Sequence, residues 1–119
     1  MNPRKIFCFV LCFLAAACAK PTPVPQVSIS PARIQHHGHV YMKGTGFTPK
    51  QNVSSHLRRP DGTEFPVLPM LTDDRGELTH DIDTLLLSPG VHEVWVVDDT
   101  AKTSSNTARF EVTLDAPSP

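Results

Sequence analysis

The strongest β-forming run in this 119-residue sequence is Val91-His92-Glu93-Val94-Trp95-Val96-Val97, which follows the turn Ser88-Pro89-Gly90. Valine occupies both faces of the run, and valine and tryptophan both favour strands. A strand that is apolar on both faces is typical of the middle of a sheet. The run therefore predicts a central β-strand over residues 91–97.

Six other short segments alternate apolar and polar residues with a period of two, the pattern of a half-buried strand. Pro66 places one of them at a sheet edge, and turns such as Pro60-Asp61-Gly62 separate them. In the segment at 78–82, Leu78, His80 and Ile82 share one face. Leu85-Leu86-Leu87 fits either a short helical turn or a buried corner. The pattern predicts an all-β, seven-stranded sandwich, with the six further strands at residues 27–30, 39–43, 53–58, 64–68, 78–82 and 108–113.

Three segments resemble bacterial immunoglobulin-like domains of the IPT/TIG kind. They are Val40-Tyr41-Met42-Lys43-Gly44-Thr45-Gly46-Phe47-Thr48-Pro49, Arg59-Pro60-Asp61-Gly62-Thr63 and Pro89-Gly90 with the run that follows to Asp98. The resemblance covers about 27–113 and implies an immunoglobulin-like β-sandwich, although the Cys…Trp…Cys core of antibody domains is absent. The resemblance does not imply any catalytic residue in this chain.

The start of the chain reads as a secretory signal. Arg4 and Lys5 precede an apolar run of about a dozen residues, shorter than the roughly 20 that a spanning helix needs. Leu14-Ala15-Ala16-Ala17-Cys18 resembles the lipobox of bacterial lipoproteins, with Ala15 in place of the commoner Leu. The resemblance implies cleavage before Cys18 and lipid attachment to its thiol. An ordinary signal peptide cut nearby is the alternative.

Prolines at every second position follow the cysteine, in Pro21-Thr22-Pro23-Val24-Pro25. Such a sequence favours the extended polyproline II conformation. We therefore expect a signal peptide over 1–17, a lipidated cysteine and proline-rich stalk over 18–26, a sandwich over 27–114 and a fraying tail over 115–119. Ala19, where an inner-membrane retention signal has Asp, favours the outer membrane by resemblance.

The charge of the chain limits the classes of partner it can bind, and its cysteine content limits the disulfides it can form. Eleven Lys and Arg oppose twelve Asp and Glu, and two of the cations (Arg4 and Lys5) leave with the signal. The remaining acidic balance argues against nucleic acid as a partner. Cys8 and Cys12 lie in the signal, so no thiol pair remains for a disulfide in the mature chain.

Strand alternation predicts which loops meet. The loops at 44–52, 69–76 and 98–106 are expected at the end that receives the stalk, and the loops at 30–38, 60–62 and 83–90 at the other end. The second end would hold the histidines with Asp81 and Asp83, a donor set that suits Zn²⁺ or Cu²⁺. A polar, solvated loop explains the same residues, and apart from a bound metal ion no cofactor is expected. The candidate metal ligands are His36, His37, His39 and His92.

At the stalk end, Asp73, Asp74, Asp98 and Asp99 could converge on Ca²⁺, although Asp is also an ordinary turn residue. Ser54-Ser55-His56 has no orienting third group in view, and we expect no enzymatic activity.

Arg58 and Arg59, with Lys43, are candidate partner contacts or a solvated strand face. Tyr41 and Trp95 would serve as sugar-stacking platforms if exposed, or as packing residues if buried. Three functions follow: an outer-membrane lipoprotein whose domain binds, scaffolds or adheres to an envelope protein; a periplasmic metal-binding lipoprotein; or a carbohydrate-binding module.

Overall fold

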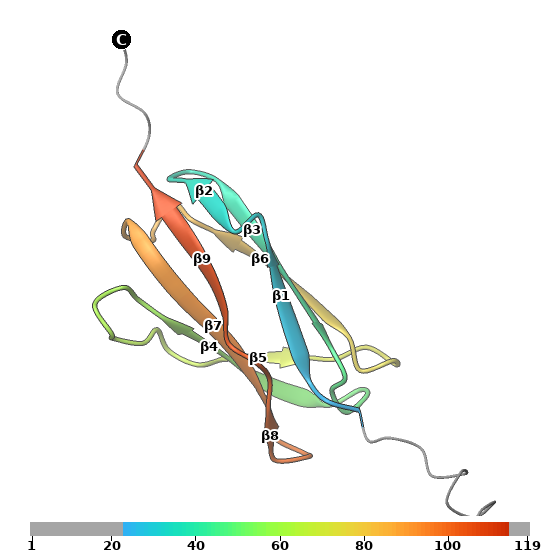
Figure 1. The fold of residues 1–119 in the computed structure, drawn as a ribbon. Helices are drawn as coiled ribbons and strands as arrows, with labels where there is room; N and C mark the ends of the chain where they lie inside the picture. Colours follow the sequence, from blue (N-terminus) through green and yellow to red (C-terminus); the bar gives the residue numbers. More distant parts are fainter. Residues whose placement is uncertain (1–22, 115–119) are drawn as a thin grey trace, which may run out of the picture.

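A computed structural model describes residues 23–114, which form nine β-strands and no helix (Figure 1). No segment within this range could therefore cross a membrane as a helix. The predicted signal peptide, Cys18, the first part of the stalk and the tail at 115–119 lie outside the described residues. The predictions for them stay predictions.

The smaller sheet has three antiparallel strands. They are β1 (Gln26–Ser30), β3 (His39–Thr45) and β6 (Leu78–Asp83), in the spatial order β1-β3-β6. Val40 and Met42 face inward from β3, and Leu78 and Ile82 face inward from β6, as the alternation predicted. The two edges of this sheet are β1 and β6.

The larger sheet has β7 (Gly90–Asp98) in its middle, as the valine-rich run predicted. On one side β7 pairs with β9 (Ala108–Thr113), which pairs in parallel with β2 (Arg33–Gln35). On the other side it pairs with β4 (Asn52–Arg58), which pairs with the edge strand β5 (Leu68–Leu71). The two-residue strand β8 (Thr103–Ser104) also pairs with β7.

This strand order is that of an immunoglobulin-like sandwich. Without the short strands β2 and β8, seven strands remain. The first, second and fifth of these (β1, β3 and β6) form one sheet, and the third, sixth and seventh (β4, β7 and β9) lie in the other, as in immunoglobulin domains. Two differences separate this arrangement from the predicted seven strands. β2 and β8 are too short to show alternation. The segment predicted as a strand at 64–68 forms only an isolated bridge, between Glu64 and Arg58, and the strand itself forms at Leu68–Leu71.

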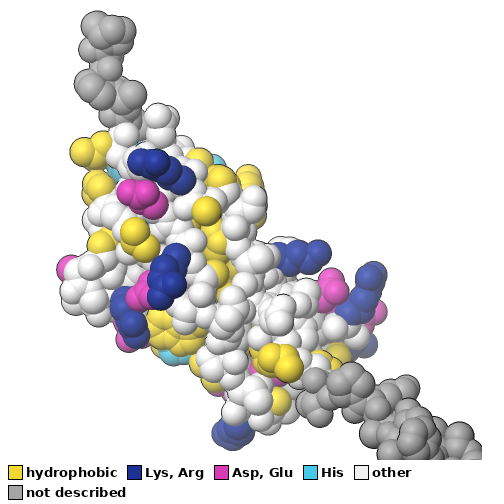
Figure 2. Space-filling view, in the orientation of Figure 1, with side chains coloured by type: hydrophobic (Ala, Val, Ile, Leu, Met, Phe, Trp, Pro, Cys, Tyr) yellow, Lys and Arg dark blue, Asp and Glu magenta, His cyan; other side chains and the backbone are white. Residues whose placement is uncertain are grey.

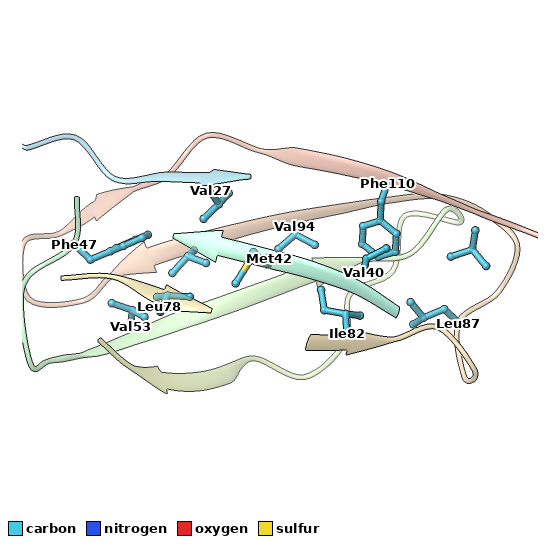
Figure 3. Close-up of a cluster of buried hydrophobic side chains, with 12 residues drawn as sticks. Val27, Val40, Met42, Phe47, Val53, Leu78, Ile82, Leu87, Val94 and Phe110 are labelled. Atoms are coloured by element: carbon cyan, nitrogen blue, oxygen red, sulfur yellow. The ribbon is translucent and has the colours of Figure 1, made fainter. Parts of the chain in front are cut away.

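Apolar side chains from both sheets fill the space between them (Figure 3). Phe110 and Met42 are the largest of the fully buried apolar side chains. Burying a side chain of this size contributes about 1.5–3 kcal/mol. The core residues are Val27, Val40, Met42, Phe47, Val53, Leu78, Ile82, Leu87, Val94, Val96, Phe110 and Val112.

The loops gather at two opposite ends, as predicted. At one end, which we call the entry pole, the loops at 46–51, 72–77 and 99–107 meet; Phe47 N–H donates to the carbonyl of Gly76 (3.2 Å) and Lys50 N–H to that of Asp73 (2.9 Å). Gly46 lies directly against the Val24 carbonyl, so the chain enters the sandwich here.

The other end, which we call the far pole, holds the loops at 36–38, 59–63 and 84–89. Thr84 N–H donates to the carbonyl of Gly38 (2.9 Å), and Pro60 lies against Gly90. β9 ends at this pole, where its Thr113 carbonyl accepts from His36 N–H (2.8 Å). Chain entry and chain exit therefore lie at opposite ends of the sandwich (Figure 1).

Candidate functional site

The buried carboxylate of the entry pole is Asp98, which is 1% exposed. It accepts hydrogen bonds from the N–H (2.7 Å) and the hydroxyl (2.9 Å) of Thr48, and from the N–H groups of Thr100 and Ala101 (both 3.0 Å). Burial opposes ionisation, but the four donors outweigh it and hold the pKa of Asp98 below its ordinary value. Asp98 therefore joins the loop after β3 to the turn after β7.

Two of the other proposed calcium ligands also bind the chain itself. Asp73 accepts from the N–H groups of Arg75 (2.8 Å) and Glu77 (2.9 Å), and Asp99 accepts from the Ser54 hydroxyl (2.7 Å). Within residues 23–114, no three His, Cys, Asp or Glu side chains lie close enough together to hold a metal ion. The geometry supports the turn interpretation of these aspartates.

The histidines at 36–39 lie at the far pole but do not surround one point. The rings of His36 and His37 meet edge to face, with centroids 4.3 Å apart. His39 places its Nδ1 2.7 Å from the Asp81 carboxylate. This hydrogen bond and the Asp81 charge raise the pKa of His39 above its ordinary value.

His92, the fourth proposed metal ligand, belongs to the core. It is 0% exposed, its ring stacks on Phe110 (centroids 5.3 Å apart), and its Nε2 lies 2.9 Å from the Ser88 carbonyl oxygen. The cause is register, because positions 92, 94, 96 and 98 of β7 all face inward. The structure thus separates His92 from the other three imidazoles.

Trp95 lies on the outer face of the larger sheet, where it is half-buried. The His56 ring, opposite it on β4, stacks on it with centroids 5.1 Å apart and planes 6° apart. The Arg58 guanidinium carbon is 4.9 Å from the indole centroid. Trp95 is therefore packed against its neighbours, which leaves less of the ring for a sugar.

The two arginines proposed as partner contacts have partners within the domain. Arg58 lies 3.5 Å from Glu93, and the Arg59 guanidinium lies over the Phe65 ring at 3.7 Å. Lys43 is on the outer face of the other sheet. The expected patch of three cations is therefore not formed, because the residues belong to different sheets.

Tyr41 is the exposed aromatic residue of the smaller sheet. Its side chain is 57% exposed on the outer face of β3, and in the sheet pairing it lies opposite Ser30 on one side and Asp81 on the other. An exposed aromatic ring beside polar side chains has the form that a sugar-stacking platform needs.

The segment Ser54-Ser55-His56 lies on β4 with its side chains on two faces. Ser55 faces the core, whereas Ser54 and His56 face outward, because neighbouring residues of a strand point to opposite faces. Ser54 donates to Asp99, and His56 Nδ1 lies 3.7 Å from Glu64. Each of the two outward side chains is thus close to a carboxylate.

Exposed apolar side chains occur at the far pole. Leu86 is 88% exposed and Leu85 46% exposed in the turn after β6, although their neighbour Leu87 is buried. Val91, on β7, and Leu114, directly after the adjacent strand β9, are also exposed. Figure 2 shows several hydrophobic side chains on the surface near the pole where β9 ends. The leucine run is thus a turn in which Leu87 is buried in the core and Leu85 and Leu86 are exposed to solvent.

His80 shares one face of β6 with Leu78 and Ile82, as the alternation predicted, and it lines a cavity that the sequence pattern did not predict. This cavity has a volume of about 250 Å³ and lies between β6 and the β4–β5 segment. Burial lowers the pKa of His80, and among the described residues its buried Nδ1 has no hydrogen-bond partner. The lining side chains are Ser55, Leu57, Phe65, Pro66, Leu68, His80, Ile82 and Val94.

A larger hollow, of about 430 Å³, lies between β6 and the end of β5. Charged side chains, Lys43, Asp73 and Glu77, form part of its wall. It lacks the continuous apolar wall of the smaller cavity.

Comparisons with known proteins give weak structural likenesses. No protein-family model matches the chain, and no curated protein matches it significantly. The chain is similar to a PKD domain of an M14-like peptidase from Thermoplasmatales archaeon SCGC AB-540-F20, with 17% identity, a TM-score of 0.44, and coverage of 82% of this chain and 100% of that one. It is also similar to the CARDB domain of a Pyrococcus furiosus protein, with 15% identity, a TM-score of 0.44, and coverage of 82% and 99%.

A further likeness is to the alkylpurine DNA glycosylase AlkC of Pseudomonas fluorescens, with 13% identity and a TM-score of 0.49. The match covers 76% of this chain but spans only 30% of the glycosylase. Likenesses at these values carry no conclusion about function. The strand order of the chain itself assigns it to the immunoglobulin-like β-sandwiches.

Proposed function

We propose that this chain is a lipid-anchored, non-catalytic binding module of a bacterial cell envelope. Cys18 would hold it at the outer membrane, the proline stalk would lift the sandwich, and the far pole would contact a protein partner. The module would act by contact and scaffolding.

The observation that carries the proposal is the opposition of the two poles. The chain enters the sandwich beside Gly46, and the most exposed large apolar side chain, Leu86, lies at the other end. A stalk that joins the entry pole would direct the far pole away from the membrane. Exposed leucine side chains suit the apolar centre of a protein interface.

The chemistry of the described residues supports binding over catalysis. Asp98 and Asp73 bind turn N–H groups, and Arg58 and Arg109 both pair with Glu93. These charged groups have structural partners, and a catalytic group would instead need its reactive atoms directed at a substrate.

The anchor is tested by membrane fractionation of cells that express Cys18→Ser. We expect this variant in the soluble fraction, still folded by circular dichroism, because the lipid-accepting thiol is gone. Cys12→Ser is the matched control, since it removes a thiol from the same segment, and it should stay with the membrane. Retention of Cys18→Ser on membranes would contradict the anchor.

The contact surface is tested by placing a photo-crosslinking amino acid at one position at a time in cells. Position 86 represents the far pole, position 71 the exposed edge strand β5 (Leu71 is 67% exposed), and position 102 the entry pole. We expect a discrete adduct, lost on mild denaturation before irradiation, at position 86 alone. An adduct at 71 or 102 without one at 86 would move the interface elsewhere.

Carbohydrate recognition is a second candidate, favoured by the exposure of Tyr41. If it holds, soluble envelope polysaccharide should shift the Tyr41 ring resonances in NMR spectra, and Tyr41→Ala should abolish binding while Trp95→Phe preserves it. Equal loss in both variants, or no shift, would remove this candidate.

A further inference from the structure

The open side of the sandwich contains a cavity whose walls have a definite chemistry. In immunoglobulin constant-type domains a fourth strand pairs with the strand equivalent to β6. Here β6 is an edge strand, and the chain that would have covered it runs instead as β5 beside β4. The cavity lies in the space between β6 and the β4–β5 segment.

The size of the cavity limits what it can hold. Its volume is about 250 Å³, whereas an apolar protein cavity of about 150 Å³ is known to take up one benzene molecule. There is room for one six-membered ring with one or two substituents. Leu57, Phe65, Ile82 and Val94 contribute carbon atoms to the wall, so the body of such a molecule would be apolar.

One polar group of the cavity wall indicates which polar group the ligand would carry. His80 lines the cavity, and its Nδ1 is buried with no hydrogen-bond partner among residues 23–114. Burial lowers the pKa of His80, so the ring is neutral at pH 7. In a neutral ring Nδ1 either donates or accepts, depending on the tautomer. A hydroxyl group can satisfy both cases because it is a donor and an acceptor.

We propose that this cavity binds a small apolar molecule of about one ring that carries a hydroxyl group, with the hydroxyl on Nδ1 of His80. Such a ligand would bury its ring against the apolar wall and would satisfy the unpaired nitrogen. The site is independent of the proposed anchor and of the far pole.

The test compares two probes of nearly the same shape, p-cresol and toluene, which differ by one hydroxyl. The full chain, labelled with ¹⁵N, is titrated with each probe, and the backbone amide shifts of β4 and β6 report binding. We expect p-cresol to bind about tenfold more tightly than toluene, the effect of one buried hydrogen bond. No saturable shift with either probe, or equal affinity for both, would overturn the proposal.

His80→Phe then assigns the difference to the imidazole. This variant keeps a ring at the position and removes its nitrogens, so the preference for p-cresol should disappear. His39→Phe, which changes an exposed histidine of the neighbouring strand, is the matched control and should keep the tenfold preference. A preference that survives in His80→Phe would contradict the assignment. The wild-type comparison decides the proposal even where the variant does not fold.

Discussion

Asp98 is the side chain whose removal should most weaken the entry pole. Its carboxylate is buried and binds two groups of Thr48 and the N–H groups of Thr100 and Ala101. Asp98→Ala would leave these donors without their acceptor, and we expect a loss of about 2–3 kcal/mol in the free energy of unfolding. Urea unfolding followed by Trp95 fluorescence measures this loss.

The adjacent Asp99→Ala is the control, because Asp99 is exposed and bonds only to the Ser54 hydroxyl among the hydrogen bonds of the described residues. It should cost less than about 0.5 kcal/mol. Equal losses in the two variants would show that burial of the carboxylate is not the cause.

The pKa of His39 should lie above that of an ordinary histidine, and the pKa of His80 should lie below it. The hydrogen bond and charge of Asp81 raise the pKa of His39, whereas burial lowers the pKa of His80. The raised pKa means that the His39 contribution to stability is present below about pH 6.5, the unfolded value, and is lost as the pH rises through the folded pKa. The lowered pKa of His80 has the opposite sign, because stability is lost as the pH falls.

NMR titration of the imidazole resonances checks both directions in one experiment. Asp81→Asn should return the His39 pKa towards its ordinary value and leave that of His80 below it. A His39 midpoint that does not respond to Asp81→Asn would show that the pair is not formed in solution.

The loop between β5 and β6 depends on Gly76, which lies against Phe47 in the loop after β3. Gly76 has φ = 75°, and a Cβ there would overlap the Phe47 carbonyl oxygen. Gly76→Ala therefore adds steric overlap to the strain of a positive φ, and we expect a loss of at least about 2 kcal/mol in unfolding free energy.

Gly62, in the turn after β4, separates these two effects. Its φ is 91°, but nothing lies within 4 Å of a Cβ at that position. Gly62→Ala should cost about 1 kcal/mol, from backbone strain alone. Denaturant unfolding of both variants measures the difference, and a Gly62→Ala loss as large as that of Gly76→Ala would remove the close-approach argument.

The elements that the sequence predicted best are those with strong local signals. The run at 91–97 forms most of β7, which pairs with β4 on one side and with β9 on the other. Val94 and Val96 face the core, whereas Val91 faces outward and is exposed. β2 and β8 were missed because three and two residues cannot show a period. β5 was predicted a few residues too early, since the chain at Glu64 and Phe65 makes only isolated contacts with β4 and the continuous ladder begins at Leu68.

The site residues also differ in whether a local pattern determines their position. Tyr41 and His39 share the outward face of β3, as alternation along one strand indicates, although the pattern alone left open whether Tyr41 is exposed. The cavity at His80 depends on which strand covers β6, a long-range choice between the two sheets that no local pattern records. His92 was assigned to a loop-end cluster because its position in the chain was clear but its inward register was not.

At the level of the whole domain, the two poles give the molecule a direction. Chain entry beside Gly46 and chain exit after Thr113 lie at opposite ends, so a tether at Cys18 would hold the domain by one end only. A tether of this kind orients the domain without burying its far pole. The orientation is therefore a property that can be measured apart from any partner.

Single cysteines at the two poles should report this orientation in lipid vesicles. We expect a fluorophore at Lys102→Cys, in the entry-pole turn, to be quenched by headgroup-attached quenchers several times more strongly than one at Leu86→Cys at the far pole. The expected cause is the position of chain entry, because under the proposed anchoring the loop at 99–107 would lie nearer the membrane than the far pole. The Cys18→Ser form of each labelled variant is the control and should show little quenching at either position. Equal quenching at both poles of the anchored protein would mean that the domain lies flat on the membrane, and the far pole would then no longer be the surface presented to a partner.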